Sequence, residues 1–151
     1  MTAPILRVAL VAALMSTPAL AQDATGDAEA GAKVFAKCQT CHVVADPEGK
    51  VLAGKNAKTG PNLYGLPGRA AGSYPEFKYG ESIVALGQSG FTWTEADFVE
   101  YVADPGKFLK AKLDDKAAKT KMTFKLANAD DAKNVWAYIA SLSPAAPAAT
   151  N

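Results

Sequence analysis

All of the cysteine and histidine in this 151-residue chain lies in one short stretch, KCQTCHVV, at residues 37–44. Cys38, Cys41 and His42 stand at positions i, i+3 and i+4, so on a helical turn the two thiols and the imidazole would share one face. Three chemistries use these residue types: a local disulfide, part of a metal site, and covalent haem attachment, for which Cys-x-x-Cys-His is the known signal. The rest of the chain decides among them.

The disulfide and zinc alternatives lack the sequence context that each requires. A Cys38–Cys41 redox disulfide of the thioredoxin kind follows a strand in a βαβ unit, and the sequence has no such pattern. A structural zinc site takes four cysteine or histidine ligands, whereas this chain has three, all within five positions. Two thiols can instead bond the edge of a porphyrin while the histidine reaches its iron. The sequence therefore predicts one covalent haem c held by Cys38, Cys41 and His42.

The sixth ligand of such an iron decides its chemistry, because an open position binds small molecules and a filled one restricts the iron to electron transfer. Beyond the first 21 residues the chain has a single methionine, Met122, in the polar stretch KTKMTF. A lone methionine is more often a flexible filler of the core. In a lysine-bearing loop that role is the weaker interpretation, and we expect Met122 to be the second axial ligand beside His42.

The first 21 residues have the pattern of a secretory signal peptide, with Arg7, an apolar run and a small-x-small site that predicts cleavage after Ala21. An uncleaved membrane anchor is the alternative, but the apolar run is short and a polar stretch follows it. Without this segment the 16 basic residues become 15, equal to the 15 acidic ones, which excludes the charge pattern of a nucleic-acid-binding protein. Seven lysines between Lys107 and Lys125 still predict one positive face.

Helix signals recur along the rest of the chain, and no alternation typical of strands is found. The predicted helices cover 27–37, 81–86 ended by Gly87, a segment from a Thr92 or Thr94 cap to Asp104-Pro105, and a segment from an Asn128 cap to Pro144. The glycine- and proline-rich stretch 45–75 predicts a long loop, which in a compact domain usually wraps something. We predict one domain over 22–143 and a disordered Pro/Ala-rich tail over 144–151.

Five stretches carry a resemblance to a known family. They are GDAEAGAKVFAKCQTCH, KTGPNLYGLPGR, YGES, TWTEADFVEYVADP and TKMTF, and the match covers nearly all of residues 26–142 in the family's order. The chain resembles the small class I c-type cytochromes, and among them the bacterial cytochrome c2 and cytochrome c550 group. The resemblance implies an all-α cytochrome c fold, in which three main helices, short helices and long loops wrap around one covalent haem.

The resemblance also implies roles for residues outside the attachment motif. The carbonyl of Pro61 would accept a hydrogen bond from the other ring nitrogen of His42, and Tyr101 would lie near the methionine sulfur. The implied donors to a haem propionate are Arg69, Tyr79 and Trp93. Each of these residues could instead be an ordinary turn, core or surface residue. Ile83 stands about where mitochondrial relatives have a buried asparagine, so we expect a different water network there.

Such a protein is a periplasmic electron carrier and not an enzyme. The resemblance implies a monomer, with no nucleic-acid partner and no stable membrane insertion, that takes single electrons from a quinol-oxidising cytochrome bc1 complex. It would pass them to a photosynthetic reaction centre or an oxidase. The lysines expected to dock the acidic faces of these complexes are Lys37, Lys58, Lys121 and Lys125. The alternative is a gas-binding or peroxidase-like haem protein, which carbon monoxide binding to the reduced protein would reveal.

Overall fold

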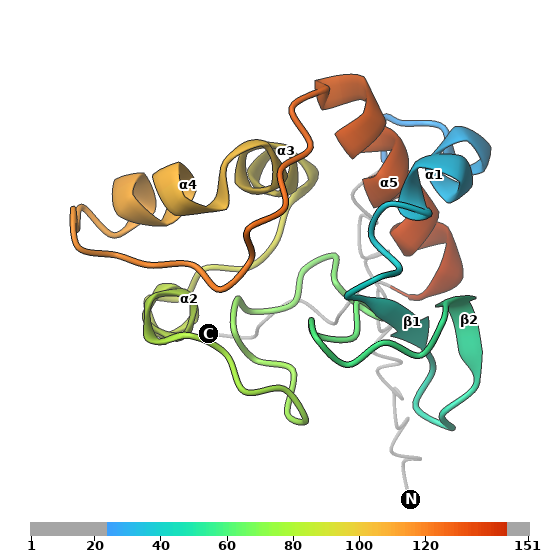
Figure 1. The fold of residues 1–151 in the computed structure, drawn as a ribbon, viewed down its shortest axis with the longest axis horizontal. Helices are drawn as coiled ribbons and strands as arrows, with labels where there is room; N and C mark the ends of the chain where they lie inside the picture. Colours follow the sequence, from blue (N-terminus) through green and yellow to red (C-terminus); the bar gives the residue numbers. More distant parts are fainter. Residues whose placement is uncertain (1–23, 145–151) are drawn as a thin grey trace, which may run out of the picture.

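The computed structural model describes residues 24–144, so the predicted signal peptide with its cleavage site and the tail beyond Pro144 lie outside the described residues. Within that range the chain forms five α-helices and one two-stranded antiparallel sheet (Figure 1). In chain order the elements are α1 (Ala28–Phe35), β1 (Val43–Ala45), β2 (Val51–Gly54), α2 (Glu81–Gln88), α3 (Glu95–Ala103), α4 (Pro105–Lys112) and α5 (Ala129–Leu142). None of these helices is long and apolar enough to cross a membrane.

The first and last helices cross at one side of the molecule (Figure 1). α1 begins after Asp27, whose carboxylate accepts a hydrogen bond from a first-turn amide at 2.8 Å and so caps the helix. Gly31 lies at the crossing, where a β-carbon would overlap the backbone of Asn134. Phe35 packs edge-on against Tyr138 of α5, with 5.5 Å between the ring centroids. This crossing fixes where the cysteine-bearing segment begins.

Two helix ends differ from the sequence prediction. α1 ends at Phe35, earlier than expected, and residues 36–41 form turns instead of continuing the helix. α2 continues through Gly87 to Gln88, so the prediction that Gly87 ends it was wrong. The glycine serves a packing contact, because a β-carbon there would overlap the carbonyl of Ala71.

The predicted stop at Asp104-Pro105 is also the start of another helix. α3 ends there as expected, and Thr94 caps its beginning through a 3.2 Å hydrogen bond from a first-turn amide. The carboxylate of Asp104 then accepts a hydrogen bond from the Lys107 amide at 3.0 Å and caps α4, which has Pro105 as its first residue. The sequence prediction missed α4, because proline suits the first position of a helix as well as the end of the preceding one.

The prediction that the chain forms no strands was wrong at the beginning of the long loop. β1 and β2 pair antiparallel in a small hairpin, with a bulge between Val44 and Ala45. The strands are only three and four residues long, which is too short for an alternating pattern to be recognised. Residues 55–80 contain no helix or strand, apart from an isolated bridge between Ala70 and Thr92. The prediction of an all-α fold is otherwise confirmed.

The chain between α4 and α5 contains no helix or strand and passes across the middle of the molecule (Figure 1). It is tied to α3 by the Leu126 amide, which donates to the carbonyl of Val102 at 2.7 Å. Beneath it lies an aromatic cluster in which Trp93 stacks on Phe108 and packs edge-on against Tyr101, with ring centroids 6.1 and 5.0 Å apart. This segment carries Met122 and faces the loops that follow the cysteines.

Candidate functional site

One cavity gathers the residues predicted to bind the cofactor. All of the predicted cofactor and axial residues line it: Cys38, Cys41, His42, Pro61, Arg69, Tyr79, Trp93, Tyr101 and Met122. Much of the remaining wall is apolar and comes from Leu63, Leu66, Ile83, Phe98, Leu109, Leu126 and Val135. Of the predicted docking lysines, Lys37 and Lys121 line the cavity, whereas Lys58 and Lys125 do not. The fold therefore brings together predicted residues as far apart in the sequence as Cys38 and Met122.

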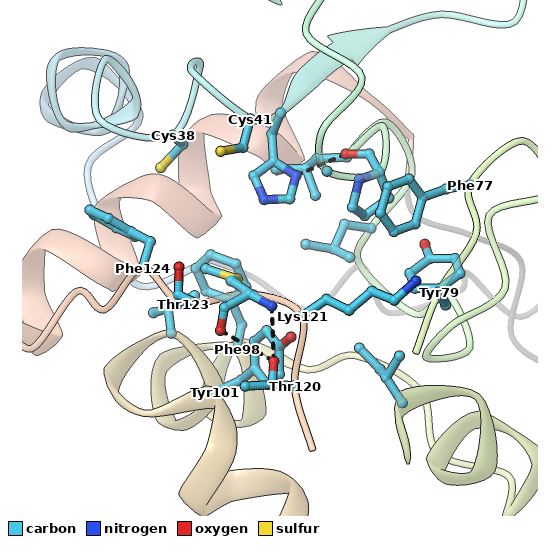
Figure 2. A pocket seen from close by; sticks show the side chains of 18 of the residues that line it. Cys38, Cys41, Phe77, Tyr79, Phe98, Tyr101, Thr120, Lys121, Thr123 and Phe124 are labelled. Carbon is cyan, nitrogen blue, oxygen red and sulfur yellow. Dashed lines mark hydrogen bonds between the residues drawn. The ribbon is translucent and has the colours of Figure 1, made fainter. Parts of the chain in front are cut away.

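The two cysteines lie on consecutive turns after α1. The Cys38 amide donates to the Phe35 carbonyl at 2.8 Å, and the Cys41 amide donates to the Cys38 carbonyl at 3.1 Å. Both thiols are free, and Figure 2 shows them side by side at one wall of the cavity. Burial raises the pKa of the Cys38 thiol to about 11, against the opposing charge of Lys37. The paired thiols suit covalent attachment of one ligand edge.

His42 is held in a single tautomer by its neighbour in the next loop. Its Nδ1 lies 2.9 Å from the carbonyl oxygen of Pro61, and since a carbonyl can only accept, Nδ1 carries the hydrogen. Burial lowers the pKa of His42, although the hydrogen bond to Pro61 opposes this shift. The lowered pKa favours the neutral imidazole, whose Nε2 lone pair can bind a metal ion.

Gly60 makes room for this imidazole and was not singled out from the sequence. A β-carbon at this position would lie 2.5 Å from Cε1 and 2.7 Å from Nδ1 of His42. The Gly60 amide also donates to the Cys41 carbonyl at 2.7 Å, which holds the backbone against the ring. The available signal was a glycine directly before Pro61, which had been assigned only to a loop.

The facing wall carries Met122 and is organised by Thr120. The Thr120 hydroxyl accepts from the Met122 amide at 3.1 Å and lies 3.2 Å from the Met122 carbonyl, to which it can donate. Burial raises the pKa of the neighbouring Tyr101, although the Thr120 hydroxyl opposes this shift. Figure 2 shows Tyr101 and Thr120 next to each other across the cavity from the cysteines. Thr120 was missed in the sequence, where its place two residues before the methionine was the only signal.

Two further contacts join the methionine segment to the residues around the start of α2. The Lys119 amide donates to the Ser82 hydroxyl at 3.0 Å. The Lys121 ammonium donates to the carbonyl of Lys78 at 2.8 Å, and Figure 2 shows Lys121 reaching toward Tyr79. Because these residues are about forty positions apart, the sequence pattern gave no sign of either contact.

A partly buried cation marks one corner of the cavity. Arg69 donates to the carbonyls of Asn62 and Tyr64 at 3.0 and 2.9 Å, and its guanidinium lies 5.5 Å from the ring centroid of Tyr74. Burial lowers the pKa of Arg69, and burial raises the pKa of Tyr79 while the nearby guanidinium opposes that shift. Among residues 24–144, no carboxylate lies within ion-pair distance of this guanidinium. A buried cation without an acidic partner favours a ligand that brings its own negative charge.

This donor set fits a haem c. Two adjacent thiols can bond one edge of the ring, while a neutral imidazole and a thioether are the usual axial pair of low-spin c-type iron. The apolar walls suit the macrocycle, and the cationic corner at Arg69 suits a propionate. His42 and Met122 would supply a nitrogen and a sulfur ligand to the iron of such a haem, whose chemistry is one-electron transfer.

Comparison with known proteins gives relatives over most of the chain, although no family model matches it. It is 64% identical over 129 residues to cytochrome c2 of Fuscovulum blasticum, covering 85% of this chain and 82% of that one. It is 48% identical over 137 residues to cytochrome c-550 of Paracoccus denitrificans, covering 89% and 85% of the two chains. The X-ray structure of cytochrome c2 from Rhodobacter sphaeroides matches with a TM-score of 0.76 and 54% identity, over 81% of this chain and 99% of that one.

Proposed function

Because this chain belongs to the cytochrome c2 family of c-type cytochromes, which are electron carriers, we propose that it carries single electrons between membrane complexes in the periplasm. The donor would be a quinol-oxidising cytochrome bc1 complex, and the acceptor a photosynthetic reaction centre or an oxidase. Residues 1–21 would direct export and would then be removed by cleavage after Ala21. N-terminal sequencing of the protein recovered from the periplasm should then begin at Gln22.

Four side chains would hold the haem. Cys38 and Cys41 would form the thioether bonds, and His42 and Met122 would occupy the axial positions through Nε2 and sulfur. The haem supplies a centre that gains and loses one electron. The observation that carries the proposal is the convergence on one cavity of both thiols, an imidazole whose other nitrogen is already bonded, and the single methionine of the described chain.

The chain favours electron transfer over binding of small molecules. His42 is fixed by Pro61 on one wall, and Met122 is fixed by Thr120 on the other, so both ligands are held in place before the iron changes its charge. A soft sulfur and an apolar surrounding favour the reduced iron, which raises the potential. A centre without an open axial position needs no substrate pocket, which is consistent with a carrier and not an enzyme.

The cavity corner would hold a propionate. Arg69 has two of its nitrogens on backbone carbonyls, which fixes the guanidinium plane and leaves further donor hydrogens. Tyr79 and Trp93 line the same cavity and can add donors. Tyr101, which lies next to Thr120, would lie beside the methionine segment (Figure 2). These donors would offset the cost of burying a carboxylate.

The mouth of the cavity would be the docking surface for acidic partners. Lys37 and Lys121 line it beside Phe124, which is 39% exposed although it is a large apolar side chain. Lys37 also lies 3.8 Å from Asp131, but an exposed pair of this kind is weak and can be given up to a partner. Of the other predicted lysines, Lys58 is exposed outside the cavity and Lys125 lies 2.6 Å from an exposed aspartate. They would contribute mainly long-range attraction.

Carbon monoxide binding to the reduced protein tests the carrier function. Negligible binding at neutral pH is expected, because Met122 would fill the sixth position. The control is Met122→Ala, which should bind carbon monoxide fast and stoichiometrically. Fast binding by the unaltered protein would instead indicate a gas-binding or peroxidase-like protein.

Ionic strength tests the docking surface separately. Electron transfer to an acidic redox partner should slow steeply as salt is added, and Lys121→Gln should weaken that dependence. Lys50→Gln, at an exposed lysine of the hairpin that lies outside the cavity, is the matched control and should weaken the salt dependence less. A flat salt response of the unaltered protein would contradict electrostatic docking and leave the haem assignment intact.

A further inference from the structure

Residues 62 and 63, which follow Gly60 and Pro61, lie along the edge of β1 that does not pair with β2. β1 pairs with β2 on one side only. Along its other side the Leu63 amide donates to the Val43 carbonyl at 2.8 Å, and the side chain of Asn62 bonds both backbone groups of Ala45. Residues 62 and 63 thus take the place of a third strand beside β1.

Asn62 is the centre of this contact. It is only 8% exposed, and its Oδ1 accepts hydrogen bonds from the amides of Ala45 and Tyr64 at 3.1 and 3.0 Å. Its Nδ2 donates to the Ala45 carbonyl at 2.8 Å and to the Tyr74 hydroxyl at 3.3 Å. Both amide hydrogens and both acceptor sites are therefore used inside the protein.

Ala45 is open to this side chain because the backbone groups of an edge strand point alternately toward and away from its partner strand. The Val43 carbonyl points the same way and bonds the Leu63 amide. The bulge lies on β2, where Leu52 has no partner on β1. The amide and the carbonyl of Ala45 both bond Asn62.

Pro61 is consequently held between two fixed points. Before it, the Gly60 amide bonds the carbonyl that precedes His42, at 2.7 Å. After it, the Asn62 side chain is fixed to β1, and Arg69 donates to the Asn62 carbonyl at 3.0 Å. Proline has no amide hydrogen of its own with which to anchor this stretch. Its carbonyl therefore keeps the 2.9 Å distance to Nδ1 of His42 only because both neighbours are anchored.

We propose that Asn62 is a positioning residue for the axial histidine: by holding the Pro61 segment on β1, it sets the hydrogen bond that tunes His42 as a donor. The proposal rests on the proposed function to the extent that His42 must bind the haem iron. A strong bond at Nδ1 makes the imidazole a better electron donor at Nε2, which favours the oxidised iron. Loosening the bond should therefore raise the reduction potential.

Asn62→Ser tests the proposal with a mild change. Serine keeps a hydroxyl that can accept from the Tyr64 amide, as in other turns of this type, but it cannot reach both groups of Ala45. The ratio of reduced to oxidised protein at a fixed ambient potential should rise about threefold, which is about 28 mV at 59 mV per tenfold for one electron. Solvent exchange of the His42 Nδ1 hydrogen, followed by NMR, should become about tenfold faster.

Asn128→Ala is the matched control. It also removes an asparagine that bonds a backbone amide, that of Asp131 at 3.0 Å, but it lies at the start of α5 away from the cavity. Its Tm should fall while its potential and its Nδ1 exchange stay unchanged. A potential and an exchange rate in Asn62→Ser equal to those of the unaltered protein would overturn the proposal.

The two readouts also separate this proposal from the carrier function. Both are measured on the isolated protein without a redox partner, so an unchanged Asn62→Ser variant would leave the carrier function untouched. Fast carbon monoxide binding by the unaltered protein, together with a raised potential in Asn62→Ser, would refute the carrier function and support the role of Asn62.

Discussion

The two walls of the cavity are held by different kinds of contact. On the histidine wall, the amides of His42, Gly60 and Leu63 bond backbone carbonyls between positions 38 and 43 at 2.7–2.9 Å. These contacts belong to a turn and to the edge of a hairpin, and they are made by the backbone itself. The side chain of Asn62 adds to them by bonding both backbone groups of Ala45.

The methionine wall depends mainly on single side chains. The hydroxyls of Thr120 and Ser82 and the ammonium of Lys121 hold a segment with no helix or strand of its own. Only one backbone hydrogen bond ties residues 119–128 to α3, from the Leu126 amide to the Val102 carbonyl. We therefore expect this wall to open first under stress, and the predictions below test that expectation from the largest effect to the smallest.

Gly60→Ala should have the largest effect, because it places a β-carbon against the His42 ring at a point where the surrounding backbone is held by hydrogen bonds. The new β-carbon would lie 2.5–2.9 Å from three atoms of the His42 ring. Since the backbone on both sides is anchored, the ring must move away from Pro61, and we expect almost no protein with covalently attached haem. The haem absorbance of purified protein, relative to its total amount, measures the loss.

Gly65→Ala controls for the loss of a glycine as such. Gly65 has a φ of 68°, and a β-carbon there would meet nothing within 4 Å. The backbone strain should cost about 1–2 kcal/mol of stability without affecting haem attachment. Normal haem content in Gly60→Ala would show that the histidine wall yields more easily than its contacts indicate.

Thr120→Val should loosen the methionine wall selectively. The change keeps the shape of the side chain but removes the hydroxyl that bonds the backbone of Met122 and lies beside Tyr101, which costs about 1–3 kcal/mol. We expect the long-wavelength absorption of the methionine–iron bond to disappear in urea well before global unfolding. Carbon monoxide should bind the reduced variant about tenfold faster, in proportion to the larger open population.

Thr123→Val is the matched control in the same segment. Thr123 also lines the cavity, but its hydroxyl makes no hydrogen bond to the described residues. In Thr123→Val, the long-wavelength absorption of the methionine–iron bond should disappear at the same urea concentration as global unfolding. Early loss in both variants would mean that the segment is weak as a whole and does not depend on Thr120.

Tyr101→Phe gives a smaller effect with a pH signature. Burial raises the folded-state pKa of Tyr101 above the ordinary value of 10. Its contribution to stability is therefore complete below about pH 10 and is lost as pH rises through the folded-state pKa, because the unfolded chain ionises first. The variant should lose about 1 kcal/mol at pH 7 and show a flatter decline above pH 10. Urea unfolding at several pH values checks both.

A double variant decides whether this effect passes through Thr120. If the two hydroxyls bond each other, Tyr101→Phe should cost less in the Thr120→Val background than alone. Strict additivity would mean that the Tyr101 hydroxyl acts through a neighbour other than Thr120, since phenylalanine keeps the ring contacts with Trp93 and Phe108.

The same contrast explains what the sequence could predict. Patterns that extend over a few residues predicted the attachment motif of Cys38, Cys41 and His42. They also predicted the helix caps at Thr94 and Asn128, each of which accepts a hydrogen bond from a first-turn amide. The family resemblance added residues spread along the chain, which the fold gathers around one cavity.

What the sequence did not predict lies in contacts between distant segments. Ser82 and Thr120 are ordinary surface residues until the methionine segment packs against α2 and α3. The role of Gly60 depends on the ring of His42, which only the hairpin brings over it. Sequence patterns are read over the length of one helix or strand and contain no information on contacts between distant segments. The hairpin and the contacts that depend on it were therefore both missed.

The smallest effect is expected from Asp104→Asn, which removes the partner of Lys125. Lys125 lies in the methionine segment, three residues after Met122. The Lys125 ammonium lies 2.6 Å from the Asp104 carboxylate and, with the Lys107 amide, lowers the pKa of that carboxyl below 3.8. This contribution to stability is therefore present above about pH 4 and is lost as pH falls through the folded-state pKa. Asparagine can still cap α4 but cannot pair with the ammonium.

The unaltered protein should thus lose slightly more Tm than Asp104→Asn between pH 6 and about pH 2.5, as followed by circular dichroism. The methionine–iron absorption should be lost at slightly lower urea in the variant at pH 6, since Lys125 anchors the segment three residues after Met122. A change at the histidine wall, seen as faster exchange of the His42 Nδ1 hydrogen, would contradict the separation of the two walls, because no contact of Asp104 reaches that side.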